Sequence, residues 1–184
     1  VIGHPIGHTM SPFLNTRLFD LAQKPASYTA QDIAPASLSD AINGLRELNG
    51  FNITIPHKQA IIPLLDGLDE KARLFHSVNT VKNENGRLIG YTTDGAGFRF
   101  ALESAGIPLS GNLLVLGAGG VSRVMAMEGL MEGCHVYVAA RRPQQAESLA
   151  AELYAACGKK AVPLSLSEVE KFVGQHKLVF DLAV

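Results

Sequence analysis

The stretch Leu113-Leu-Val-Leu-Gly117-Ala-Gly119-Gly120-Val121-Ser122 decides how this sequence folds. Its four apolar residues predict a buried strand, and the glycines that follow predict a tight turn into a helix. In this context glycines bind a dinucleotide: Gly117 permits the turn, and Gly119 lets the backbone approach a pyrophosphate at the helix N-terminus. Ser122 stands where a third glycine is usual. We therefore expect cofactor binding by Gly117, Ala118, Gly119, Gly120 and Val121. A tight turn without a ligand is the alternative.

The second strand of such a unit ends near the adenosine ribose, where an acidic residue would favour NAD. Here the sequence reads Val138-Ala-Ala-Arg141-Arg142-Pro143 and contains no acid. A guanidinium group matches the charge and geometry of a 2′-phosphate, so Arg141 and Arg142 predict NADP as the cofactor. A solvated pair of surface arginines is the alternative. For Arg123, in the preceding helix, a phosphate contact and a surface role are both left open.

Strand and helix signals alternate around the glycine stretch. Strands are predicted at 113–116, 136–140, 161–164 and 178–182, with helices at 120–132, 144–156 and 167–173. Connections of this length imply parallel strands. Four such strands are somewhat more than half of the usual six-stranded doubly wound sheet, so residues 101–184 are expected to form a Rossmann domain truncated at its C-terminus.

Residues 1–100 have a different pattern. Ser11 and Pro12 predict a helix start, with Ser11 as the N-cap. Phe51, Ile53 and Ile55 are predicted to share one face of a strand that Pro56 ends. Asn85-Gly86 between two apolar runs predicts a hairpin, and hence an antiparallel pair. The expected fold class is therefore α/β, with an N-terminal mixed-sheet domain followed by the Rossmann domain.

Composition limits the class of partner. The 184 residues carry a formal net charge of -1 and are 47% hydrophobic, which disfavours a nucleic-acid binder and favours a small-molecule substrate. No apolar run approaches the about 20 residues of a membrane span. Two distant cysteines, Cys134 and Cys157, suit a reducing compartment, so we expect a cytoplasmic protein with no membrane partner. The histidines lack metal-ligand spacing, so no metal is expected. A homodimer is left open.

Two charged residues suit the chemistry of a nicotinamide cofactor, since hydride transfer to a ketone requires a proton donor. Lys58 follows the end of the predicted strand at 51–55, and Asp94 begins a predicted helix. A solvated lysine and a plain helix N-cap are the alternative interpretations.

Five segments together resemble the shikimate dehydrogenase family, in the family's order and over almost the whole chain. They are Gly3-His-Pro-Ile-Gly-His-Thr9-Met-Ser11-Pro12, Phe51-Asn-Ile-Thr54-Ile-Pro-His-Lys58, Val78-Asn79-Thr80-Val81, Thr93-Asp94-Gly95-Ala-Gly97-Phe98 and Gly117-Ala-Gly-Gly120. The resemblance implies a substrate-binding domain at 1–100 and an NADP-binding domain at 101–184. It also implies reversible NADPH-dependent reduction of 3-dehydroshikimate to shikimate, in chorismate and aromatic amino-acid biosynthesis.

The resemblance assigns roles to single residues. Lys58 and Asp94 would form the catalytic pair, and Thr9 and Ser11 would hold the substrate carboxylate. Substrate hydroxyl groups would bind to Thr54, Asn79 and Asp94. Of the motif histidines, His57 is expected to shape the turn.

Several positions depart from the family pattern. Thr9 replaces a usual serine, His76-Ser77 replaces Gly-Ala, and Thr92-Thr93 replaces Asn-Thr. The alternatives are therefore a quinate or aminoshikimate dehydrogenase, a non-catalytic binding relative, or another NADP enzyme such as a folate dehydrogenase. Both ends are expected to be cut, leaving about two thirds of a two-domain enzyme.

Overall fold

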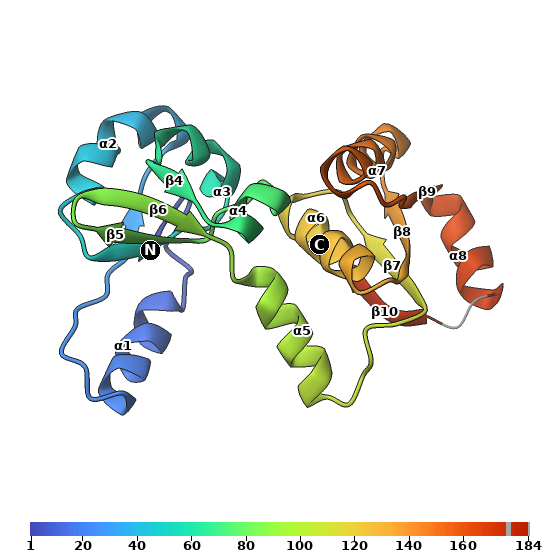
Figure 1. Cartoon of the computed structure of the whole chain (residues 1–184), viewed down its shortest axis with the longest axis horizontal. Helices are drawn as coiled ribbons and strands as arrows, with labels where there is room; N and C mark the ends of the chain where they lie inside the picture. Colours follow the sequence, from blue (N-terminus) through green and yellow to red (C-terminus); the bar gives the residue numbers. More distant parts are fainter. Residues whose placement is uncertain (176–177, 184) are drawn as a thin grey trace. The chain divides into compact units, whose positions relative to one another are not determined.

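The computed structural model describes residues 1–175 and 178–183, and the chain forms two compact units, Val1–Thr92 and Thr93–Val184 (Figure 1). The sequence predicted this boundary eight residues later, between residues 100 and 101. The observed boundary lies earlier because helix α5 (Asp94–Ser104) packs on helix α6 (Gly120–Met131) of the second unit. The whole of α5 therefore belongs with the glycine-rich segment.

The second unit is a doubly wound α/β unit with a parallel four-stranded sheet in the order β10-β7-β8-β9. The predicted elements are all present, with ends shifted by one or two residues. The strands are β7 (Asn112–Leu116), β8 (His135–Ala140), β9 (Val162–Ser165) and β10 (Leu178–Ala183). The helices that follow α6 are α7 (Pro143–Cys157) and α8 (Leu166–Gln175).

Helices cover both faces of this sheet (Figure 1). Helix α6 packs on one face, where Gly129 approaches Leu113 and Val136. Leu114 and Tyr137 are the next residues along β7 and β8, so their side chains point to the opposite face, where they pack with Phe172 of α8. The chain thus changes direction between β7 and β10, and the glycine turn that follows β7 lies at this switch point.

The first unit is built on a mixed sheet in the order β3-β5-β6-β4, with a separate parallel pair of β1 and β2. Its strands are β1 (Ile2–Gly3), β2 (Gln31–Asp32), β3 (Gly50–Asn52), β4 (Gly67–Leu68), β5 (Thr80–Glu84) and β6 (Arg87–Tyr91). Its α-helices are α1 (Ser11–Leu21), α2 (Leu38–Leu45), α3 (His57–Ala60) and α4 (Glu70–Phe75), with 3-10 turns η1 (Pro35–Ser37) and η2 (Ile62–Leu64).

Two local expectations for this unit were wrong. Phe51 and Ile53 are buried, but Ile55 is 67% exposed, because the strand ends at Asn52 and only a bridge from Ile53 to Ile2 continues it. Ser11 is the first residue of α1 rather than its cap; the N-cap position is Met10, which makes no side-chain capping bond.

Helix α1 buries none of its residues, and Phe13, Leu14, Leu18 and Leu21 are all exposed on it. The core of the unit comes instead from other elements, including Leu38 and Leu45 of α2. Within the described part of the chain, no helix is both long and apolar enough to cross a membrane.

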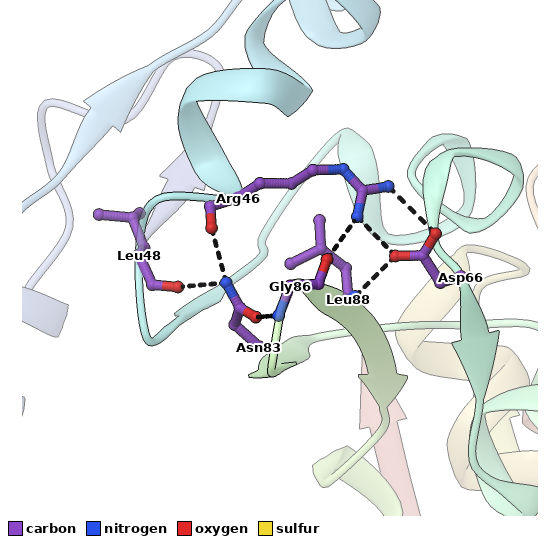
Figure 2. Close-up of polar contacts among 6 residues, drawn as sticks. All are labelled: Arg46, Leu48, Asp66, Asn83, Gly86 and Leu88. Atoms are coloured by element: carbon purple, nitrogen blue, oxygen red, sulfur yellow. Dashed lines mark hydrogen bonds and ion pairs between the residues drawn. The ribbon is translucent and has the colours of Figure 1, made fainter.

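The predicted hairpin is present and is held at its turn by a polar clamp (Figure 2). Asn85 and Gly86 both have positive φ, of 55° and 88°. Arg46 at the end of α2 donates to both carboxylate oxygens of Asp66, at 2.6 and 3.2 Å, and to the Gly86 carbonyl at 3.0 Å. Asp66 also accepts from the Leu88 N–H at 2.7 Å. The clamp therefore joins α2, the segment before β4, and the hairpin.

Candidate active site

A cavity of about 340 Å³ lies at the carboxyl edge of the parallel sheet in the second unit. Parallel α/β sheets bind their ligands at this edge. Its walls come from the ends of β7 and β8 and from the helices that follow. The lining residues are Leu116, Gly117, Ala118, Gly119, Ala139, Ala140, Arg141, Gln145 and Leu166.

The glycine turn has the backbone geometry that an anion site needs. Gly117 has φ of 116°, a conformation that side-chain-bearing residues rarely adopt, and its N–H donates to the Ala139 carbonyl at 2.7 Å. Gly119 is the N-cap of α6, and a Cβ added to it or to Gly120 would meet no atom within 4 Å. The first N–H groups of α6 thus lie beside the cavity, and the two glycines place no side chain between these groups and a ligand.

Close packing of α6 on the sheet, which a third glycine of the fingerprint usually allows, occurs elsewhere on the helix. Ser122 occupies the third position and is fully buried. The close approach comes at Gly129, where an added Cβ would lie 2.3 Å from Leu113 Cδ2. The departure at Ser122 is therefore compatible with a tightly packed glycine turn.

The structure separates the two predicted arginines. Both are exposed, but Arg141 lines the cavity, whereas Arg142 is the N-cap position of α7 and is not among the lining residues. Arg123 forms an ion pair with Glu152 of α7, and partial burial lowers the pKa of its guanidinium. Sequence reasoning missed Gln145 and Leu166; each lies in the first turn of a helix that follows a parallel strand, and that position was the available signal.

In the first unit, main-chain hydrogen bonds bring together the segments that carry Thr54, Lys58 and Asn79. The Val78 N–H donates to the Lys58 carbonyl at 2.8 Å, and the Ile53 N–H donates to the Asn79 carbonyl at 2.8 Å. All three predicted residues are partly buried. The arrangement places a lysine ammonium, a hydroxyl and a carboxamide on adjacent backbone segments.

Thr9 and Ser11 form a hydroxyl pair at the start of α1. The Thr9 hydroxyl donates to Ser11 Oγ at 3.1 Å, and the Ser11 N–H donates to Thr9 Oγ1 at 3.2 Å. Strand β1, which precedes this pair, packs against Thr54: a Cβ added to Gly3 would lie 2.5 Å from Thr54 Cγ2. Two hydroxyl groups this close together can bind one carboxylate, with the Thr9 hydroxyl turned from Ser11 to the ligand.

A side-chain hydrogen bond between His4 and Asp32 holds the loop between Gly3 and Thr9. His4 Nδ1 lies 2.6 Å from Asp32 Oδ1, and the Ile6 N–H donates to Asp32 Oδ2 at 3.2 Å. The hydrogen bond with the His4 side chain, helped by the Ile6 N–H, lowers the pKa of Asp32. The loop that carries Thr9 is thereby fixed to β2.

The remaining motif histidines differ in environment. His57 is fully buried, and its Nε2 lies 2.6 Å from the Ile33 carbonyl oxygen, as expected of a residue that shapes the turn. His76 is exposed in a left-handed conformation with φ of 48° at the end of α4, and Ser77 beside it is buried. Neither His76 nor Ser77 is part of the group formed by Thr54, Lys58 and Asn79.

Asp94 is the first residue of α5, in the second unit, and is partly buried. Lys58 lies in α3 of the first unit, so each member of the predicted pair is positioned within its own unit. In the part of the chain that the structure describes, no three His, Cys, Asp or Glu side chains form a group that could hold a metal ion.

A mixed-sheet unit followed by a doubly wound unit with a glycine turn at its switch point is the architecture of dehydrogenases that bind a dinucleotide. The family model for the shikimate dehydrogenase substrate binding domain matches residues 1–81. A shikimate dehydrogenase (NADP(+)) from Symbiobacterium thermophilum is 43% identical over 157 residues, which is 83% of this chain and 53% of that protein.

Solved structures agree with this match. The shikimate 5-dehydrogenase of Thermus thermophilus in complex with NADP(H) and shikimate is 39% identical, with a TM-score of 0.81 over 88% of this chain and 61% of its own. Its complex with shikimate is 36% identical, with a TM-score of 0.81 over 91% of this chain and 68% of its own. The chain belongs to the shikimate dehydrogenase family. It spans 53% of the Symbiobacterium protein and 66% of a Bacillus cereus relative.

Proposed function

We propose that this chain carries out NADP-dependent interconversion of shikimate and 3-dehydroshikimate, with residues 1–100 binding the substrate and residues 101–184 binding the cofactor. The observation that carries the proposal is the grouping of Thr54, Lys58 and Asn79 by main-chain hydrogen bonds in one unit. The relatives named above, which act on or bind shikimate, support the choice of substrate.

The lining of the cavity in the second unit offers groups that suit the phosphates of a dinucleotide. Gly117 and Gly119 leave the backbone accessible, the α6 N-terminus offers N–H groups to the pyrophosphate, and Arg141 offers a guanidinium to a 2′-phosphate. When bound, the cofactor would supply the hydride acceptor for oxidation of the carbinol, as NADP, and the hydride donor for reduction of the ketone, as NADPH.

Lys58 and Asp94 would handle the proton. Oxidation of the carbinol releases a proton from its oxygen as the C–H hydride leaves, and in the reverse direction the same oxygen takes a proton up. A lysine ammonium beside that oxygen stabilises developing negative charge, and a carboxylate keeps the ammonium oriented. Because such groups titrate jointly, we assign the proton to the pair.

The other residues would orient the ring. The Thr9 and Ser11 hydroxyls would bind the substrate carboxylate, while Thr54, Asn79 and Asp94 would bind ring hydroxyls. Fixing the ring at several points places the reacting carbon at the cofactor and lowers the entropic part of the barrier.

Replacement of Lys58 tests the proposal. Lys58→Ala is expected to lower kcat by about 10²- to 10⁴-fold, with a smaller change in KM for shikimate. Lys82→Ala, on the exposed hairpin, is the control. Calorimetric binding of shikimate and of NADP separates loss of turnover from loss of binding. A kcat within threefold of the native chain would remove Lys58 from the mechanism.

The same assay distinguishes the alternative substrates. Shikimate, quinate and aminoshikimate are compared with NADP and with NAD, and we expect shikimate with NADP to have the highest kcat/KM. Tight binding without any turnover would instead indicate a non-catalytic relative, and binding of a folate would indicate a folate dehydrogenase. We further propose that the protein works in the cytoplasm, and light scattering tests whether it forms a homodimer.

A further inference from the structure

Glu128 is an acidic residue in the middle of helix α6 with an unusual environment. Among the side chains that the structure describes, it is the one carboxylate that is buried, with 2% exposure. A carboxylate is expensive to remove from water, so a buried one needs polar or charged neighbours. The elements packed against Glu128 show what it contacts.

The contact is with the first turn of α5. A Cβ added to Gly95 would lie 2.3 Å from Glu128 Oε1 and 2.7 Å from its Cγ, so the Glu128 side chain lies directly against the Gly95 backbone. Two residues later, a Cβ on Gly97 would meet nothing within 4 Å. A side chain at position 95 would therefore force the Glu128 side chain to move, and Gly95 directly follows Asp94.

A charged contact lies one turn further along α5. Arg99 Nη1 lies 3.9 Å from Glu128 Oε2 and 2.8 Å from Glu132 Oε1. The guanidinium partly offsets the desolvation of the buried carboxylate. Helix α6 thus holds α5 at two points, the Gly95 backbone and the Arg99 side chain.

The same helix begins in the glycine turn beside the cofactor cavity. We propose that Glu128 is a positioning residue for Asp94: by fixing the first turn of α5 on α6, it sets the place of Asp94 relative to the glycine turn. The proposal rests on the proposed function in giving Asp94 a role in the reaction. A misplacement of about 1 Å at such a group is enough to lower turnover by up to about 10²-fold.

Paired variants on α5 test the contact. Gly95→Ala is expected to displace the Glu128 carboxylate and to lower kcat for shikimate oxidation about tenfold, while KM for shikimate and Kd for NADP stay within about twofold. Gly97→Ala, on the same turn, is the control and should leave all three within about twofold of the native chain.

Paired variants on α6 complete the design. Glu128→Ala should lower kcat by a similar factor, whereas Glu132→Ala, which removes the exposed partner of the same arginine, should leave kcat within about twofold. In the double variant Gly95→Ala/Glu128→Ala the clash is gone, so its kcat should equal that of Glu128→Ala alone.

Three results would overturn the proposal. The first is a fold-loss of kcat in the double variant that equals the product of the fold-losses in the two single variants. The second is a kcat of Glu128→Ala within about twofold of the native chain. The third is a loss of kcat accompanied by equal losses of ligand binding and of thermal stability. If the native chain does not turn over shikimate, the proposed function fails, and the Asp94 amide resonance in ¹H–¹⁵N spectra becomes the readout. It should shift in Glu128→Ala and keep its position in Glu132→Ala; an unshifted resonance in Glu128→Ala overturns the positioning role.

Discussion

Arg141 and Arg142 show how neighbouring residues of the same type can have different surroundings. Arg141 ends the connection from β8 and lines the cavity, while Arg142 begins α7 and lies outside the lining set. The turn into a helix rotates successive side chains by about 100°, so adjacent residues rarely face the same ligand. We therefore propose Arg141, rather than Arg142, for the 2′-phosphate contact.

Arg141→Ala is expected to weaken NADP binding about tenfold or more, because a charge-assisted hydrogen bond is worth about 1.5 to 3 kcal/mol. NAD, which lacks the 2′-phosphate, should bind about as well as to the native chain. Calorimetry with both cofactors measures the difference, and Arg142→Ala is the matched control. Equal weakening for NADP and NAD would show that Arg141 does not contact the phosphate.

At the scale of elements, the first unit depends on polar contacts between segments far apart in the sequence. Asp66 accepts from Arg46 and from the Leu88 N–H, and these hydrogen bonds, led by the one from Arg46, lower its pKa to about 2 from an ordinary 3.8. A carboxyl group whose folded pKa is lowered stabilises the fold above the unfolded pKa and loses that contribution as the pH falls through the folded value. The clamp in Figure 2 should therefore weaken between about pH 4 and pH 2.

Asp66→Asn is expected to lower the midpoint of urea unfolding at pH 7, because the amide cannot replace the carboxylate that Arg46 and Leu88 share. It should also reduce the decline in stability between about pH 4 and pH 2. Urea titrations at several pH values measure both effects, with Asp20→Asn on α1 as the control. An unchanged pH profile in Asp66→Asn would assign the acid sensitivity to other groups.

At the scale of the whole molecule, the residues that we propose for the chemistry are divided between two units that each have their own sheet. Lys58, Thr54 and Asn79 belong to the first unit, and the glycine turn, Arg141 and Asp94 belong to the second. Helix α5 belongs to the second unit because its residues Arg99 and Gly95 contact α6. The lining residues of the cavity given above all belong to the second unit.

Addition of NADP alone should therefore stabilise the two units unequally. At about 100 times its Kd, a ligand adds about 2.7 kcal/mol to the unfolding free energy of the structure that binds it. Hydrogen exchange by mass spectrometry should become slower at 112–123 and 135–145 and stay unchanged at 51–58 and 78–82. Equal protection of both sets of peptides would contradict a cofactor site confined to the second unit.

The sequence by itself predicted the second unit well. Strands β7 and β8 are short apolar runs that are followed by Gly117 and Arg141, and each crossover has helical periodicity, so local patterns and the parallel topology agree. The Asn85-Gly86 hairpin was confirmed for the same reason, since its turn type depends on those two residues alone. The patterns also placed Asp94 at a helix start, where the structure has it, whereas Lys58 lies in the short helix α3, which the sequence did not predict.

Tertiary structure decided what no local pattern contains. The exposure of Ile55 depends on where β3 loses its partner, and the unit boundary depends on contacts of α5 with α6. The buried contact of Glu128 with Gly95 joins residues 33 positions apart, and the local sequence of neither segment predicts it. Side-chain type and spacing determine which chemistry is available, whereas burial and long-range packing determine which of those groups come together.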